Sequence, residues 1–264
     1  MIGRPLRTGA LVVDTNPSRE GMVSPVVGSH PGWPLVVYFH HVRADLAHYT
    51  VLRPSEFAFA LDLLGRWFRP MDPIALGCPV ATWPQEPTCL LTFDDGYSDV
   101  LEQAVPLMDD RGWRALMFVP TGRVGTVEEH PERGAIKHMG WDELRELQAQ
   151  GHRIGSHGHL HRDLSLLDVD TVRAELTTAG GTLACELGLD RPPLAYPYGN
   201  EPEGLEQLSD ALSPLCFGSA KAPAASWAAR PRLIRRTFLP RGESELWPAL
   251  VKGWRREWEN HASR

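Results

Sequence analysis

The sequence predicts an α/β fold whose core is a mainly parallel sheet. Apolar runs of strand length alternate with segments of helix length over most of the chain. Such an alternation implies right-handed crossovers between parallel strands. The polar motifs directly follow the ends of expected strands, where barrels and open doubly wound sheets both place their functional sites. These observations locate the site and leave both architectures open.

The expected strands cover residues 35–39, 88–93, 115–119, 152–155, 193–196, 215–219 and 233–238. Of these, 35–39 is a continuous run of apolar and aromatic residues and 88–93 carries no charge, as strands buried inside a sheet do. The expected helices cover residues 54–68, 98–110, 141–150, 170–187, 204–212 and 243–258. Gly151 follows the third helix as its expected C-terminal cap, Gly188 follows the fourth, and the last helix is amphipathic.

The chain has 264 residues, of which 42% are hydrophobic, enough for one α/β barrel or for two small domains. Residues 1–33 are rich in Gly, Pro, Ser and Arg, and we expect an N-terminal arm or cap there, followed by one catalytic domain over 34–264. The net charge of −6 gives no basic excess for nucleic acid. No apolar run approaches the ~18 to 20 residues of a membrane span.

The N-terminus and the cysteines bear on location. After Arg4 and Arg7, the apolar stretch 10–13 is broken by Asp14, whereas a secretory leader needs about 7 to 15 apolar residues. A cytoplasmic location is therefore expected. The cysteines form no C-x-x-C pair, and buried thiols are the first interpretation, with a disulfide pair as the alternative. They are Cys78, Cys89, Cys185 and Cys216.

The first polar cluster is Thr92-Phe-Asp-Asp-Gly96. Two adjacent carboxylates at a strand end repel each other unless a cation or a proton relieves them. Gly96 can adopt a positive φ and turn the chain, so that Asp94 and Asp95 face one cavity. One carboxylate would then ligate a metal while the other accepts a proton from water. The alternative is a solvated acidic turn.

The second cluster is Ser156-His-Gly-His-Leu-His161. His157 and His161 are four residues apart, a spacing that places two side chains on one helical face. Two imidazoles and a carboxylate suit zinc, cobalt, iron or nickel, and three protein ligands leave a position open for catalysis. His159 is expected to point elsewhere. Surface histidines are one alternative, and a non-haem iron triad through Asp163 is another, although such triads usually lie on antiparallel sheets.

The third cluster is Tyr196-Pro-Tyr-Gly199, at the end of another expected strand. The backbone N–H of Tyr198 can donate to a developing oxyanion. The aromatic rings would suit a sugar ring. A Pro-Gly turn with packing tyrosines is the alternative.

Together these clusters resemble the motifs of carbohydrate esterase family 4, the polysaccharide deacetylases. Thr92–Gly96 matches the family's T-F-D-D-G, and Ser156–His161 matches its S-H-[TG]-x-x-H. Ala195-Tyr-Pro-Tyr-Gly199 is similar to its third motif, R-x-P-Y-G. The resemblance extends over roughly residues 34–220.

The resemblance implies a distorted (β/α) barrel with about seven strands. It implies that Asp94 is the catalytic base and that Asp95, His157 and His161 hold a divalent metal, with zinc first and cobalt, nickel or iron as alternatives. The implied reaction removes an N-acetyl group from an amino sugar, oligosaccharide or glycoconjugate and releases acetate. Hydrolysis of a non-sugar imide or ureide, or glycan binding without catalysis, are the competing functions.

The chain departs from the family pattern in two ways. The Arg of the third motif falls on Ala195, so that Arg235 or Arg236 is expected to accompany the base instead. The family's late motifs are not visible, and no His occurs between His161 and His261 to act as general acid. Tyr38-Phe-His-His-Val42 is similar to the Y-H-x-V element of deacetylases with permuted motif order, which implies His40 as the acid.

Overall fold

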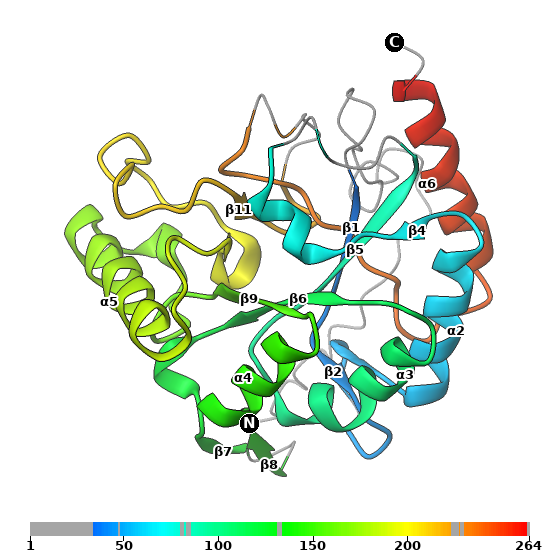
Figure 1. Cartoon of the computed structure of the whole chain (residues 1–264), viewed down its shortest axis with the longest axis horizontal. Helices are drawn as coiled ribbons and strands as arrows, with labels where there is room; N and C mark the ends of the chain where they lie inside the picture. Colours follow the sequence, from blue (N-terminus) through cyan, green and yellow to red (C-terminus); the bar gives the residue numbers. More distant parts are fainter. Residues whose placement is uncertain are drawn as a thin grey trace, which may run out of the picture.

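A curved sheet of parallel strands forms the centre of the computed structural model (Figure 1). The structure describes residues 34–46, 48–79, 82, 86–130, 134–222, 227 and 230–262, so that the predicted arm over 1–33 lies outside the described residues. The strand order is β1 (Leu35–Phe39), β5 (Thr88–Phe93), β6 (Ala115–Val119), β9 (Arg153–Ser156), β10 (Leu194–Ala195) and β11 (Cys216–Phe217), and β4 (Arg69–Pro70) pairs with the start of β5.

Residues 234–237 join the two edges of this sheet. Ile234 forms a parallel bridge with Phe217 of β11, and Thr237 forms one with Val37 of β1. The Thr237 backbone donates to Val36 O at 2.9 Å and accepts from Tyr38 N at 2.9 Å. The predicted strand 233–238 is thus present as two bridges, and the sheet curls into a distorted barrel, as predicted.

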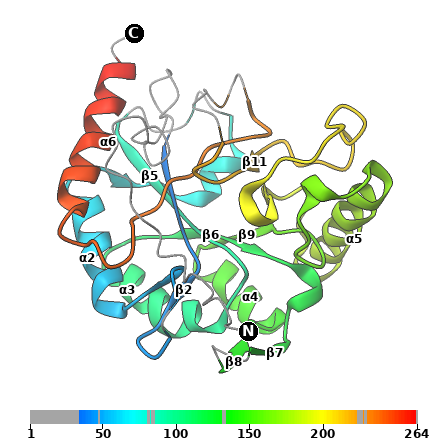
Figure 2. The ribbon, with the colours of Figure 1, turned by 180° about the vertical axis from the view of Figure 1, so that it is seen from behind.

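The helices lie outside the sheet (Figures 1 and 2). They are α2 (Pro54–Gly65), α3 (Val105–Asp109), α4 (Trp141–Ala149), α5 (Val169–Leu187) and α6 (Trp247–Ala262). Buried side chains of α2 and α6, among them Phe57, Leu61 and Trp247, belong to the same apolar cluster as Phe39 and Phe93 of the sheet. This packing buries the outer face of the barrel and holds the strand ends in place.

Several short elements were not predicted. They are β2 (His41–Val42), β3 (Val51–Leu52), the antiparallel pair β7 (Val127–His130) and β8 (Gly134–Lys137), and the short helical turns η2 (Pro73–Gly77), η5 (Thr121–Arg123), η6 (Leu164–Leu166) and η7 (Pro197–Gly199). Each is at most five residues long, too short to show a hydrophobic period.

Three predicted helices differ from the structure. Residues 204–212 form successive turns instead of a regular helix. Their backbone N–H groups donate to carbonyls three residues back as well as four, as when Leu208 N donates to both Leu205 O and Gly204 O. The helix predicted over 98–110 contains a π-helix, η4 (Val100–Ala104), before α3. The final helix begins only at Trp247, with Pro248 in its first turn, where a missing N–H is harmless.

The structure also bears on two further expectations, that the cysteines are buried thiols and that no segment spans a membrane. All four thiols are free; Cys89 and Cys216 are buried as expected, whereas Cys78 and Cys185 are exposed, since they lie on turns and helix surface outside the sheet. None of the helices in the described part of the chain combines the length and apolarity that crossing a bilayer requires.

Candidate active site

Asp94 and Asp95 stand at the C-terminal end of β5, on a sharply turned segment. Asp95 and Gly96 both adopt the left-handed conformation, with φ of 71° and 67°. A Cβ on residue 96 would lie 2.9 Å from Cγ1 of Val119 on the neighbouring strand, so this position needs glycine for its space as well as its φ. The turn directs the two carboxylates to different partners.

Asp95 meets the two predicted histidine ligands. Its Oδ1 lies 2.9 Å from Nε2 of His161 and 3.6 Å from Nε2 of His157. The three side chains offer ligand atoms that all lie within 4.8 Å of one another. The histidines do not share a helical face, as their spacing suggested; they converge from a loop after β9 in which Gly158 and His161 have positive φ. The predicted grouping is therefore present on a different local structure.

The donor set fits a divalent cation. Oδ1 of Asp95 is buried and makes no hydrogen bond within the described residues, although the His161 nitrogen is only 2.9 Å away. An unsatisfied buried carboxylate oxygen beside two imidazole nitrogens is the arrangement that a cation would complete. His157 Nδ1 is 2.7 Å from the carbonyl oxygen of Ala195, so that this nitrogen donates and Nε2 keeps its lone pair for the cluster.

The protonation states also suit metal ligands. Burial lowers the pKa of His157 to about 4, which keeps the imidazole neutral. Burial alone would raise the pKa of Asp95, but the close approach of His161 and the neighbouring imidazoles hold it well below its usual range. The cluster is thus a carboxylate with a neutral imidazole at physiological pH.

Asp94 is paired with Arg236 instead. Nη1 and Nη2 of Arg236 donate to Oδ1 and Oδ2 of Asp94 at 2.6 and 2.8 Å, and both side chains are buried. Nε of Arg236 donates to Gly218 O at 2.7 Å, and the guanidinium lies 5.0 Å from the ring centroid of Tyr38. Of the two predicted candidates, Arg236 is therefore the one that accompanies Asp94, while the charged neighbour of Arg235 is Glu257.

This pair determines the ionisation of Asp94. Burial alone would raise the pKa of the carboxyl, but the charge of Arg236 and its hydrogen bonds overcome that effect and lower the pKa below its usual value. Asp94 is therefore an ionised carboxylate with fixed orientation, as a base requires.

His40 and Tyr198 lie beside the two carboxylates. Nε2 of His40, at the end of β1, is 4.0 Å from Oδ2 of Asp94, and burial lowers the pKa of this imidazole. Tyr198 has a φ of 61°, and its ring, 59% exposed, lies 5.1 Å from the ring of His161. The structure thus brings all the predicted site residues to one end of the barrel.

Residues 83–213 match the family model described as polysaccharide deacetylase. This part of the chain belongs to the polysaccharide deacetylase family. The chain is 26% identical over 129 residues to a chitin deacetylase from Pestalotiopsis sp, covering 49% of this chain and 38% of that protein. It is 27% identical over 143 residues to a probable peptidoglycan-N-acetylglucosamine deacetylase of Arthroderma benhamiae, covering 53% and 30%. The matches thus span well under half the length of these relatives.

Solved structures support the polysaccharide deacetylase fold. IcaB from Ammonifex degensii is similar with a TM-score of 0.65 and 22% identity, over 84% of this chain and 97% of that one. The Streptococcus pyogenes deacetylase PplD in complex with acetate has a TM-score of 0.66 and 20% identity, over 83% and 96%. The likeness extends over nearly all of both solved chains and therefore includes the barrel as a whole.

The sequence did not point to two buried residues, His138 and Glu175, that support the candidate site. His138 Nδ1 lies 2.9 Å from the carbonyl oxygen of Asp95, and Met139 N donates to Gly96 O at 2.9 Å, so that the segment after β8 fastens the left-handed turn. Glu175 of α5 contacts the histidine loop. Glu175 has a recognisable signal, since it is the acidic member of an otherwise apolar helical stripe with Val172, Leu176 and Ala179.

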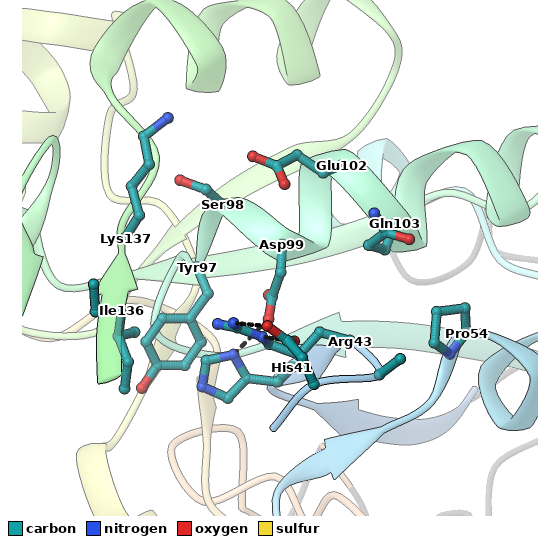
Figure 3. Close-up of a pocket in the computed structure, with 13 residues that line it drawn as sticks. His41, Arg43, Pro54, Tyr97, Ser98, Asp99, Glu102, Gln103, Ile136 and Lys137 are labelled. Atoms are coloured by element: carbon teal, nitrogen blue, oxygen red, sulfur yellow. Dashed lines mark hydrogen bonds and ion pairs between the residues drawn. The ribbon is translucent and has the colours of Figure 1, made fainter. Parts of the chain in front are cut away.

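A pocket of about 490 Å³ is lined by His41 and Tyr97, which directly follow His40 and Gly96 of the candidate site (Figure 3). His41 of β2 lies on its floor, stacked on Tyr97 at 3.7 Å between ring centroids, with Nδ1 2.7 Å from Oδ2 of Asp99. Lys137 of β8 and Glu102 lie at its other side. None of the predicted catalytic or metal-ligating residues lines this pocket, which is therefore a neighbour of the site.

Proposed function

We propose that this protein is a metal-dependent hydrolase that removes an N-acetyl group from an amino-sugar-containing substrate and releases acetate. The observation that carries the proposal is the division between two adjacent carboxylates: Asp95 faces two imidazoles, whereas Asp94 is held by Arg236. Family membership and the deacetylase relatives support the same reaction class.

Asp95, His157 and His161 would hold the cation, with zinc first and cobalt, nickel or iron as alternatives. When bound, the cation supplies Lewis acidity that polarises the amide carbonyl and acidifies the attacking water. The neutral His157 and the ionised Asp95 need lose no proton to act as ligands. His159, whose Nδ1 lies 2.9 Å from Oγ1 of Thr121, takes no part in this set.

Asp94 accepts the proton of the water that attacks the acetyl carbonyl. Its lowered pKa keeps it ionised, and the two hydrogen bonds from Arg236 fix its orientation. The backbone N–H of Tyr198 donates to the oxygen that becomes negative as the tetrahedral species forms.

His40 gives a proton to the leaving nitrogen. Because burial lowers its pKa, the imidazole is neutral at rest and needs a proton during the cycle. The nearest source is the proton that Asp94 has just accepted, since Nε2 of His40 lies 4.0 Å from Oδ2 of Asp94. The water proton thus passes through Asp94 and His40 to the amine as the C–N bond breaks and acetate forms.

The decisive experiment measures acetate release from N-acetylglucosamine oligomers beside a panel of small imides and ureides. We expect acetate from the oligomers, loss of turnover after chelation and its recovery on adding zinc. Turnover of the imides alone would contradict the sugar substrate. Oligomer binding without acetate from the zinc-loaded protein would contradict hydrolysis altogether.

A further inference from the structure

Glu175 is a buried carboxylate outside the set of residues that the proposed reaction uses. It lies on α5 within the buried stripe Val172, Leu176, Ala179 and Leu183, and it is only 6% exposed. A glutamate at such a position loses its hydration, a cost that requires compensating hydrogen bonds. The hydrogen bonds that Glu175 makes show which part of the protein its buried carboxylate stabilises.

The carboxylate binds the backbone of the histidine loop. Its Oε2 accepts hydrogen bonds from the backbone N–H of His159 at 3.1 Å and of Leu160 at 2.9 Å. The nearest cation is Arg162, whose Nη1 is 3.9 Å from Oε1 and whose side chain is 46% exposed. The strong interactions of Glu175 are therefore those with two successive amides inside the segment between His157 and His161.

That segment has an unusual backbone. Gly158 has a φ of 74° and His161, a residue with a Cβ, has a φ of 56°. A non-glycine residue in this region is strained and persists only where its surroundings hold it. The start of the loop is held by backbone contacts to β6 and η5, since His157 N donates to Val119 O at 2.9 Å and Thr121 N donates to Gly158 O at 3.2 Å. The amide of Leu160, directly before His161, is held by Glu175.

We propose that Glu175 is a positioning residue that sets the metal affinity of the site by holding the turn that presents His161. The inference rests on the proposed metal site. Glu175 acts through the His159 and Leu160 amides, and this contact keeps Nε2 of His161 at 2.9 Å from Oδ1 of Asp95. Partners of this kind, one step removed from the ligands, typically change metal affinity by about 10- to 100-fold when removed.

The test compares zinc affinity, measured by competition with a chelator, in the full chain and three variants. Glu175→Ala should bind zinc about 10- to 100-fold more weakly. Glu175→Gln keeps an oxygen that can accept both amides and should retain most of the affinity. Glu186→Gln removes a carboxylate from the same helix, where it pairs with Arg145 at the surface, and should match the wild type.

Amide hydrogen exchange of the metal-free proteins gives a readout independent of zinc. In Glu175→Ala the amides of His159 and Leu160 should exchange faster, while those of β5 and β6 keep their protection. Wild-type affinity in Glu175→Ala, or equal weakening in Glu175→Gln and Glu175→Ala, would overturn the proposal. If Glu175→Ala does not fold, Glu175→Asp takes its place, because its side chain is one methylene too short to hold the His159 and Leu160 amides in the same way, and unchanged zinc affinity in that variant would overturn the proposal. A wild-type protein without zinc affinity would reject the proposed function, and this outcome is distinct because the exchange comparison needs no metal.

Discussion

Arg236 makes a two-point ion pair with Asp94 across 142 residues of sequence, with N–O distances of 2.6 and 2.8 Å. The guanidinium enters from the segment that bridges β11 and β1, so that Asp94 and its partner belong to different parts of the fold. This pair keeps the Asp94 carboxyl ionised and fixes its orientation, which no neighbour within the T-F-D-D-G motif does.

Removing the guanidinium should therefore weaken both activity and folding. In Arg236→Gln the pKa of Asp94 loses the interaction that lowers it, so that the acidic limb of kcat/KM should move to higher pH. The unpaired buried carboxylate should also cost about 3 to 5 kcal/mol of stability. A pH–rate profile and urea unfolding test both effects, with Arg235→Lys as control. If the acidic limb of kcat/KM in Arg236→Gln stays at the wild-type pH, Asp94 is not the catalytic base.

The two imidazole ligands and the base should be separable by metal analysis. His157→Ala and His161→Ala should each lose zinc and turnover, because each removes one of three ligands. Asp94→Asn should keep zinc and lose turnover. His159→Ala, on the same loop but directed to Thr121, is the matched control and should keep its zinc. Zinc retained after either ligand substitution would show that the cation is held elsewhere.

His40→Gln should lower turnover by on the order of 10² to 10⁴ with an unchanged metal content, because it removes the proposed acid and leaves the three ligands intact. Steady-state acetate release and metal analysis of the same preparation measure the two quantities. Activated substrates, whose leaving nitrogen needs less protonation, should be affected less. Normal turnover of ordinary substrates in the variant would assign the acid to another group.

His152 should make stability depend on pH. It is 2% exposed, its Nδ1 accepts the amide of Ala115 at 3.1 Å, and burial lowers its pKa to about 4. The unfolded imidazole binds a proton near its ordinary pKa of about 6.5, so that stability falls as the pH drops from about 6.5 towards 4, by at most about 3 kcal/mol. Urea unfolding across this range should show a shallower dependence in His152→Gln than in the wild type. Parallel curves would contradict the assignment, since the other buried histidines are common to both proteins.

Gly199, at the end of the third motif, should tolerate no side chain. Its φ is 74°, and a Cβ would lie 2.4 Å from the side chain of Ser219. Gly188 has a similar φ of 66° with nothing within 4 Å of the added atom, which makes Gly188→Ala the matched control. Both variants bear the backbone strain of about 1 to 2 kcal/mol, and Gly199→Ala should lose about 1 to 3 kcal/mol more through overpacking. Equal thermal midpoints for the two would show that Ser219 moves aside.

The grouping of Asp95, His157 and His161 was predictable because these residues lie in short segments at strand ends. The strands 35–39, 88–93 and 115–119 are seen with the predicted bounds, since continuous apolar runs indicate burial on both faces. The choice between Arg235 and Arg236 was not predictable, because successive residues of an extended segment face opposite sides and the register comes from tertiary contacts.

Other features depended on contacts that the sequence does not display. His138 reaches the Asp95 carbonyl from a segment 43 residues away, and nothing local to either residue indicates that contact. Residues 204–212 have helical composition, yet the turns packed beneath α5 replace the helix, a case in which tertiary structure overrides propensity. Glu175 could have been found from its place in an apolar stripe.

Because Arg236 belongs to the segment that shuts the barrel, the order of assembly has a chemical consequence. Asp95, His157 and His161 all precede α5 in the chain, whereas the partner of Asp94 lies 142 residues away, a contact whose formation must overcome the entropy of closing a long loop. A molecule in which residues 234–237 have not docked would leave the Asp94 carboxylate without its guanidinium partner. The proposed hydrolysis would therefore require the closed barrel.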